Sequence, residues 1–218
     1  MSTNCCQHDH GAEADPHRGD PTYRRILWIV LGINALMFVV EIAAGLTAGS
    51  ASLQADALDF LGDTANYAIS LAVVGMALRY RATAALLKGA TMGLFGLWVV
   101  STVIWHSVMA SVPEPITMGV VVFAALAANA ACFGLLYARR TGDANMRSVW
   151  ICSRNDVMGN LAVLLAALGV FGTGTGWPDV IVAAVMAALA LQGAVLVVRH
   201  AWQELQSPQG RLATQISN

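Results

Sequence analysis

Long apolar segments separated by short polar breaks make up most of the chain. A helix needs about 20 apolar residues to cross the hydrocarbon core of a bilayer. Six segments meet this requirement, and they cover residues 26–48, 51–78, 84–111, 115–138, 146–171 and 178–198. Gly, Ser and Pro mark breaks at residues 48–50, 112–115 and 172–178. The pattern predicts an all-α polytopic membrane protein with six transmembrane helices.

Basic residues occur only at alternate breaks between these segments. Arg18, Arg24 and Arg25 come before the first segment, and Arg79, Arg81 and Lys88 lie around the junction of the second and third. Around the start of the fifth segment the chain has Arg139, Arg140, Arg147 and Arg154, and after the sixth it has Arg199 and Arg211. The positive-inside rule makes this side cytoplasmic. Both the N- and the C-terminus are therefore predicted to be cytoplasmic, and the even number of spans agrees, because it places both termini on the same side.

Composition sharpens this picture. Hydrophobic residues make up 57% of the 218 residues and charged residues 11%, against about a quarter charged in an ordinary soluble domain. A water-soluble globular protein is thereby excluded, and a net charge of −1 with no basic stripe argues against a nucleic-acid partner. We divide the chain into a flexible cytoplasmic arm (1–22) that carries Cys and His, a six-helix transmembrane domain (23–200) and a short cytoplasmic tail (201–218).

Five carboxylates lie well inside the apolar segments, away from their first and last turns, where each costs roughly 2.5–3.5 kcal/mol on insertion scales. They are Glu41, Asp56, Asp59, Asp63 and Asp156. Asp59 and Asp63 are four residues apart and share a helical face. Asp156 and Asn160 repeat this spacing in the fifth segment, with Cys152 one turn earlier. Such residues at membrane depth indicate a functional site.

The two pairs are expected at the same depth. At 1.5 Å per residue, Asp59 and Asp63 lie roughly 12 and 18 Å from the outer end of the second segment. Asp156 and Asn160 lie roughly 21 and 15 Å from the outer end of the fifth. Four ligand side chains at one level suit a divalent cation, and so much negative charge there requires a cation or protons. The sequence predicts a metal site near the bilayer midplane.

The motifs that carry these residues resemble those of a known family. The run from Gly49 to Asp63 is similar to the second-span signature of the cation diffusion facilitator family: a small-residue lead, an Ala-Asp-Ala step, then His or Asp, three residues and Asp. The run from Asn155 to Asn160 resembles the fifth-span signature, which is normally His or Asp, three residues and Asp. The resemblance covers about residues 23–200.

The resemblance implies that the protein exports a divalent transition metal from the cytoplasm in exchange for protons and forms a homodimer, in a bacterial cytoplasmic membrane. By motif position, Asp59, Asp63 and Asp156 would be metal ligands, with Asn160 in the fourth ligand position. No tightly bound cofactor is implied. Most members carry a cytoplasmic ferredoxin-like domain after the sixth span, for which residues 201–218 are too few, so a short member lacking it is expected.

Two features bear on the choice of metal and point in opposite directions. The fifth span has Asp where many zinc exporters have His, and the resulting all-oxygen site suits harder ions such as Mn²⁺. The N-terminal arm instead carries Cys5, Cys6, His8 and His10, which are ligands for Zn²⁺ and softer ions. We expect Zn²⁺, with Cd²⁺, Co²⁺ and Mn²⁺ as alternatives. The arm is either an accessory metal-capture site or a tail in which Cys and His occur by chance.

Other polar residues in the segments have open roles. Cys152 is either an accessory entry ligand or an ordinary buried thiol. Asn34 and Glu41 are seven apart on one face of the first segment and either line the ion pathway or make interhelical hydrogen bonds. Asp56 is either structural or assists metal release.

Other functional classes remain open. One is a metal-responsive membrane sensor or partner subunit, and another is a passive metal channel. The sequence has no nucleophile–base pair and no nucleotide-binding loop, so an enzyme is not predicted.

Overall fold

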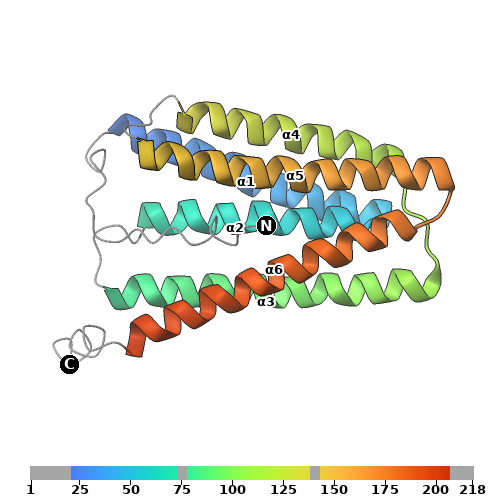
Figure 1. Cartoon of the computed structure of the whole chain (residues 1–218). Coiled ribbons are helices and arrows are strands. Elements are labelled where there is room, and N and C mark those ends of the chain that lie inside the picture. The colour runs from blue at the N-terminus through green and yellow to red at the C-terminus, as the bar shows by residue number, and fades with distance from the viewer. Residues whose placement is uncertain (1–20, 73–77, 138–142, 207–218) are drawn as a thin grey trace.

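Six helices account for almost all of the described chain. The computed structural model describes residues 21–72, 78–137 and 143–206. The helices are α1 (Pro21–Ala48), α2 (Ala51–Ala72), α3 (Leu78–Met109), α4 (Pro115–Tyr137), α5 (Asp143–Thr173) and α6 (Trp177–Gln206). They form an elongated bundle in which successive helices run in opposite directions (Figure 1). The start of α1 and the end of α6 lie at the same end of the bundle (Figure 1), as the prediction of six spans requires.

Five of the six helices are long and apolar enough to cross a membrane; these candidate spans are 24–48, 82–109, 115–137, 156–173 and 177–203. The exception is α2, whose three aspartates lower its hydropathy although its 22 residues extend about 33 Å. It lies among the other helices and packs against α1, α3, α5 and α6. Among the described residues no large exposed hydrophobic side chain belongs to α2. The helix is therefore stabilised mainly by packing against its neighbours, and of its three aspartates Asp56 is fully buried.

The predicted boundaries agree with the helices within two residues at one end of the bundle, whereas at the other end only the end of α4, at Tyr137, agrees as closely. Leu78 was expected at the end of the second span, but it begins α3, whose helix therefore includes the arginine-bearing stretch. The sixth helix continues to Gln206 instead of ending at residue 198. Hydropathy detects where the apolar stretch ends, whereas Arg, Leu and Gln are good helix formers and extend the helices beyond it.

The three short connections lie together at what we call the distal end of the bundle. They join α1 to α2, α3 to α4 and α5 to α6. Gly49 and Gly174 adopt φ values of 65° and 64°, the left-handed conformation in which glycine commonly ends a helix. The backbone N–H of Glu114 donates to the Ala48 carbonyl at 2.9 Å, so two of these connections are joined directly.

Asp179, in the first turn of α6, caps the first turn of α2. Its buried carboxylate accepts hydrogen bonds from the Ser50 hydroxyl (2.7 Å), the Ala51 N–H (2.8 Å), and the Ser52 hydroxyl (2.6 Å) and N–H (3.1 Å). A helix N-terminus carries free N–H groups and favours an anion. The serines at the start of α2 therefore serve to fasten α2 to α6.

Glu114 caps α4 in the same way but in a solvent-exposed position. Its carboxylate accepts the N–H groups of Ile116 (3.0 Å) and Thr117 (2.5 Å), with Pro115 at the first helical position, where proline is favoured. The hydrogen bonds to Thr117 and Ile116 hold the pKa of Glu114 below its ordinary value. Because the folded-state pKa is lowered, this contribution to stability is present at neutral pH and is lost as the pH falls through that pKa.

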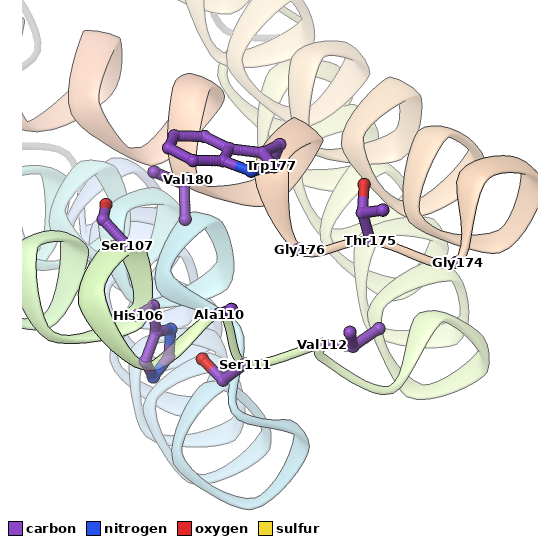
Figure 2. A pocket seen from close by; sticks show the side chains of 10 residues that line it. All are labelled: His106, Ser107, Ala110, Ser111, Val112, Gly174, Thr175, Gly176, Trp177 and Val180. Atoms are coloured by element: carbon purple, nitrogen blue, oxygen red, sulfur yellow. The ribbon is translucent and has the colours of Figure 1, made fainter.

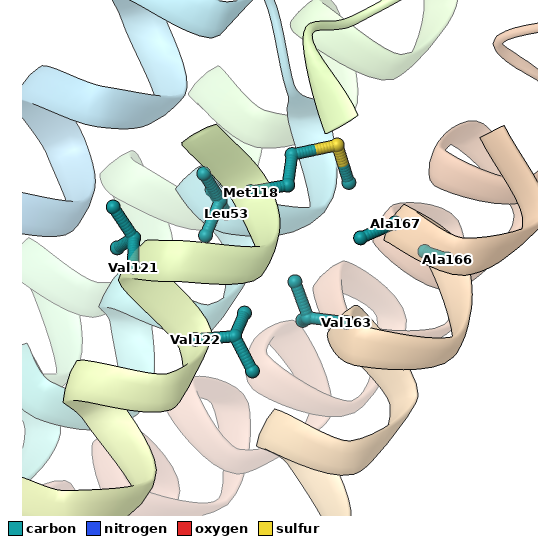
Figure 3. Packing of buried hydrophobic residues seen from close by; sticks show 7 residues of the cluster. All are labelled: Leu53, Met118, Val121, Val122, Val163, Ala166 and Ala167. Atoms are coloured by element: carbon teal, nitrogen blue, oxygen red, sulfur yellow. The ribbon is translucent and has the colours of Figure 1, made fainter. Parts of the chain in front are cut away.

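An apolar cluster fills the bundle between the distal end and the acidic residues. Leu53 of α2 packs among α4 and α5 side chains, as Figure 3 shows; the cluster comprises Leu53, Met118, Val121, Val122, Val163, Ala166 and Ala167. Leu53 precedes Asp59 by six residues on the distal side. The cluster thus separates the acidic part of α2 from the distal end.

Candidate metal site

Three of the four predicted ligands line one narrow pocket in the bundle. The pocket is too narrow to hold a water molecule, and it is lined by Asn34, Asp59, Phe60, Asp63, Asn129 and Asp156. These residues come from α1, α2, α4 and α5. The antiparallel arrangement of α2 and α5 brings Asp156 level with the aspartate pair of α2, which is the placement that the depth estimate predicts.

Asp59 occupies the most open position in this part of α2. It is exposed, whereas Leu58 and Phe60 on either side of it are buried. A carboxylate in such a position is open to a small cation.

Gly159 allows α5 to approach the aspartates of α2. A Cβ at this position would lie 3.3 Å from Asp59 Oδ2 and 3.5 Å from Asp56 Oδ1. Any larger side chain would press against both carboxylates. The glycine lies between the two predicted ligands of α5, Asp156 and Asn160. The sequence gave no sign of its role, because its contact with the aspartates of α2 depends on how the two helices pack.

Asn160, the fourth predicted ligand, is buried beside the pocket but does not line it. Its Nδ2 donates to the backbone carbonyl of Asp156 at 2.9 Å. Its amide oxygen has no hydrogen-bond partner. Asn160 as a ligand stays a prediction.

A second pair of carboxylates, Glu41 and Asp56, lies next to the pocket. The two are 0% and 1% exposed and share a side-chain hydrogen bond, which requires one of the two carboxyl groups to carry the proton. They interact electrostatically with each other, and Asp56 also with Asp59. Neither side chain lines the pocket. Both are therefore neighbours of the predicted ligands and are not themselves in position to contact an ion there.

Lys88 is a feature of this region that the sequence interpretation missed. It was expected near the cytoplasmic junction of the second and third spans, but it lies within α3 and is only 7% exposed. Its ammonium group donates a hydrogen bond to Asn66 Oδ1 on α2. Lys88 also interacts electrostatically with Asp63, one turn from Asn66. The lysine thus places a positive charge beside a predicted metal ligand.

The carboxylates line the same pocket but are not close enough together to coordinate one ion. Across residues 21–72, 78–137 and 143–206, no three His, Cys, Asp or Glu side chains are arranged closely enough to hold a metal. Cys5, Cys6, His8 and His10 lie outside the described residues, and so does the side chain of Cys152. The accessory-site predictions therefore stay predictions.

A larger cavity lies apart from the acidic residues. It has a volume of about 250 Å³ and opens between the end of α3 and the start of α6. Figure 2 shows His106 and Ser107 on one wall and Trp177 and Val180 on the other. No carboxylate lines it, so it is not the site that the motifs predict.

Comparison with known proteins identifies the family. A model of the cation efflux transmembrane domain matches residues 27–206. The chain belongs to the cation efflux family. This confirms the resemblance found in the second and fifth spans. It also places the chain among transport proteins and not among enzymes, as predicted.

Curated relatives of this cation efflux protein are bacterial zinc transporters. It is 28% identical to the zinc transporter ZitB of Escherichia coli over 212 residues, and 28% identical to that of Yersinia pestis over 199 residues. These matches cover 91% and 85% of the chain but 65% and 64% of the relatives. The chain therefore spans about two thirds of their length. Family, spans and relatives together make it a multi-pass integral membrane protein.

Proposed function

We propose that the protein exports a divalent transition metal cation from the cytoplasm in exchange for protons. The ligands are Asp59, Asp63 and Asp156, with Asn160 in the fourth position by motif. One observation carries the proposal. Three carboxylates from two antiparallel helices line a single pocket inside the bundle.

Charge explains why such a pocket binds a cation. Buried carboxylates are unfavourable in a low-dielectric interior unless a cation or protons neutralise them. A divalent ion entering between α2 and α5 draws the carboxylates together, because they are too far apart to enclose it beforehand. Protons are the alternative occupants, so metal entry releases protons and proton entry favours metal release. This competition is the physical basis of the proposed exchange.

Zn²⁺ is the proposed substrate, with Cd²⁺, Co²⁺ and Mn²⁺ as alternatives. The relatives named as zinc transporters support Zn²⁺. The oxygen-only ligand set predicts a weaker preference for Zn²⁺ over harder ions than a histidine-containing site has. We further propose that both termini are cytoplasmic and that the protein acts as a homodimer.

Transport by the purified chain in proteoliposomes tests this proposal. We expect Zn²⁺ flux that a pH gradient stimulates. Asp59→Asn and Asp63→Asn each keep the side-chain shape but remove the charge, and each is expected to lower the flux at least about tenfold, equivalent to about 1.4 kcal/mol. Glu114→Gln is the matched control, because this carboxylate is exposed at the distal end, and it should transport at the wild-type rate.

The outcomes separate the alternatives. Wild-type flux in both aspartate variants would show that the site is assigned wrongly. Flux that is indifferent to the pH gradient would indicate a passive channel. Metal binding without flux of Zn²⁺, Cd²⁺, Co²⁺ or Mn²⁺ would favour a sensor or partner subunit.

A further inference from the structure

We propose that Asn34 of α1 is a further metal ligand, which supplies a neutral oxygen donor to the cation from a third helix. The inference rests on the proposed function, because it takes the pocket between α2 and α5 to be the metal site. Neither spacing nor motif assigns this role to Asn34. The assignment comes from where the helix packing places its amide group.

Hydrogen bonding fixes the orientation of the Asn34 amide. Its Nδ2 donates to the Val30 carbonyl at 2.8 Å and to Cys132 Sγ of α4 at 3.5 Å. A backbone carbonyl only accepts hydrogen bonds, so the group that faces Val30 must be the NH₂ and not the oxygen. The amide oxygen is therefore directed away from both partners.

That oxygen has no hydrogen-bond partner although Asn34 is only 1% exposed. Buried polar atoms are almost always paired, and an unpaired one requires an explanation. Asn34 also lines the pocket together with Asp59, Asp63 and Asp156. A cation among these carboxylates would pair with the free oxygen and so provides the explanation.

The other asparagines near the site do not combine these properties. Asn160 has an unpaired, buried amide oxygen but does not line the pocket. Asn129 lines the pocket, but its oxygen is not a buried unpaired atom. Asn34 alone among these three has both. Amide oxygens are common ligands of hard divalent cations alongside carboxylates, so the donor type fits the all-oxygen set.

The primary test is Zn²⁺ affinity of the purified full chain in detergent, measured by competition with a chelating dye. Asn34→Leu preserves the approximate volume and removes the oxygen; we expect its Zn²⁺ affinity to fall at least about tenfold. Asn34→Asp keeps an oxygen at the same position, and we expect it to retain the wild-type affinity or exceed it. Glu114→Gln, at the exposed distal end and outside the pocket, is the control and should stay within about twofold of the wild type.

Asp59→Asn distinguishes failure of this inference from failure of the proposed function. Wild-type affinity in Asn34→Leu with a large loss in Asp59→Asn would overturn the role of Asn34 and leave the metal site standing. Wild-type affinity in both variants would overturn both proposals.

A second measurement looks for a new absorption signal, so its interpretation does not depend on whether Asn34→Leu folds. Asn34→Cys places a thiol at the proposed ligand position, and Co²⁺ bound by a thiolate shows a sulfur-to-metal charge-transfer absorption. We measure it in a chain in which Cys5, Cys6 and Cys152 are replaced by Ser, so that Cys132 is the one native thiol left. We expect the band when this chain also carries Asn34→Cys, and not when it keeps Asn34. Asn129→Cys is the positional control. A Co²⁺-loaded Asn34→Cys protein without the band would overturn the proposal.

Discussion

Lys88 introduces a positive charge next to the aspartates of the pocket. It is buried, donates to Asn66 and interacts with Asp63. Buried charges persist when they are paired, and Asp63 supplies the opposite charge in the absence of metal. A divalent cation that binds Asp63 therefore lies near the positively charged ammonium group of Lys88, which repels it.

Replacing Lys88 is expected to strengthen metal binding. Lys88→Met keeps the length and apolar character of the side chain but removes the charge, so the cation no longer competes with an ammonium group for Asp63. We expect Zn²⁺ to bind about tenfold more tightly, which corresponds to about 1.4 kcal/mol. Lys88→Arg keeps the charge and should stay close to the wild type. Chelator competition measures both, and unchanged or weaker binding by a folded Lys88→Met protein would contradict the expectation.

The residues of the site differ in how far the sequence could predict them. Asp59, Asp63 and Asp156 could be selected because a carboxylate in an apolar segment is conspicuous and a spacing of four defines a face. Asn34 and Lys88 could not be connected to them, since their relation to α2 depends on how α1 and α3 are rotated against it. That rotation is set by packing over whole helices, and no local pattern encodes it.

At the scale of elements, the distal boundaries were predictable and the others were not. Gly49, Pro115 and Gly174 mark their breaks by backbone chemistry, and the helices end or begin within a residue or two of them. Around Leu78 the sequence offers only a change in hydropathy, so the boundary was misplaced. The second helix was predicted from its apolar run, but its three aspartates leave it outside the five most apolar helices. Its packing against α1, α3, α5 and α6 shows how the bundle accommodates it.

The link between α2 and α6 is expected to be important for stability. Asp179→Ala removes one carboxylate and leaves two hydroxyl and two backbone N–H groups without their acceptor. Unsatisfied buried groups cost about 1–3 kcal/mol each before local relaxation, so we expect a net loss of about 2–4 kcal/mol. Thermal unfolding in detergent should show Tm lowered by roughly 5–10 °C.

Two comparisons check the origin of that loss. Ser52→Ala removes a single hydroxyl donor and should have a smaller effect than Asp179→Ala. Glu114→Gln alters the exposed cap of α4 and should have the smallest effect at neutral pH. Equal Tm values for Asp179→Ala and the wild type would show that the α2–α6 link does not limit stability.

At the scale of the whole molecule, polarity is arranged inside out relative to a soluble protein. Exposed surfaces of the described helices carry large apolar side chains such as Trp28, Leu94 and Phe171. The acidic residues are concentrated on α2 and its neighbours in the interior. Composition alone predicted this class of protein, because only a lipid-facing surface tolerates so little charge. Helix packing was needed to show which face of each helix turns inward.

The two carboxylate caps at the distal end have a consequence for the rate at which backbone amides exchange with deuterium. The N–H groups of Ala51 and Ser52 are bound to a buried carboxylate, whereas those of Ile116 and Thr117 are bound to an exposed one. Helix starts usually fray and exchange quickly, and protection rises towards the global stability only where opening requires larger unfolding. The first-turn amides of α2 should therefore exchange as slowly as those in a helix interior. The first-turn amides of α4 should exchange as quickly as those of other frayed helix ends. In Asp179→Ala this difference should disappear, and the first turn of α2 should become the site where the bundle begins to open.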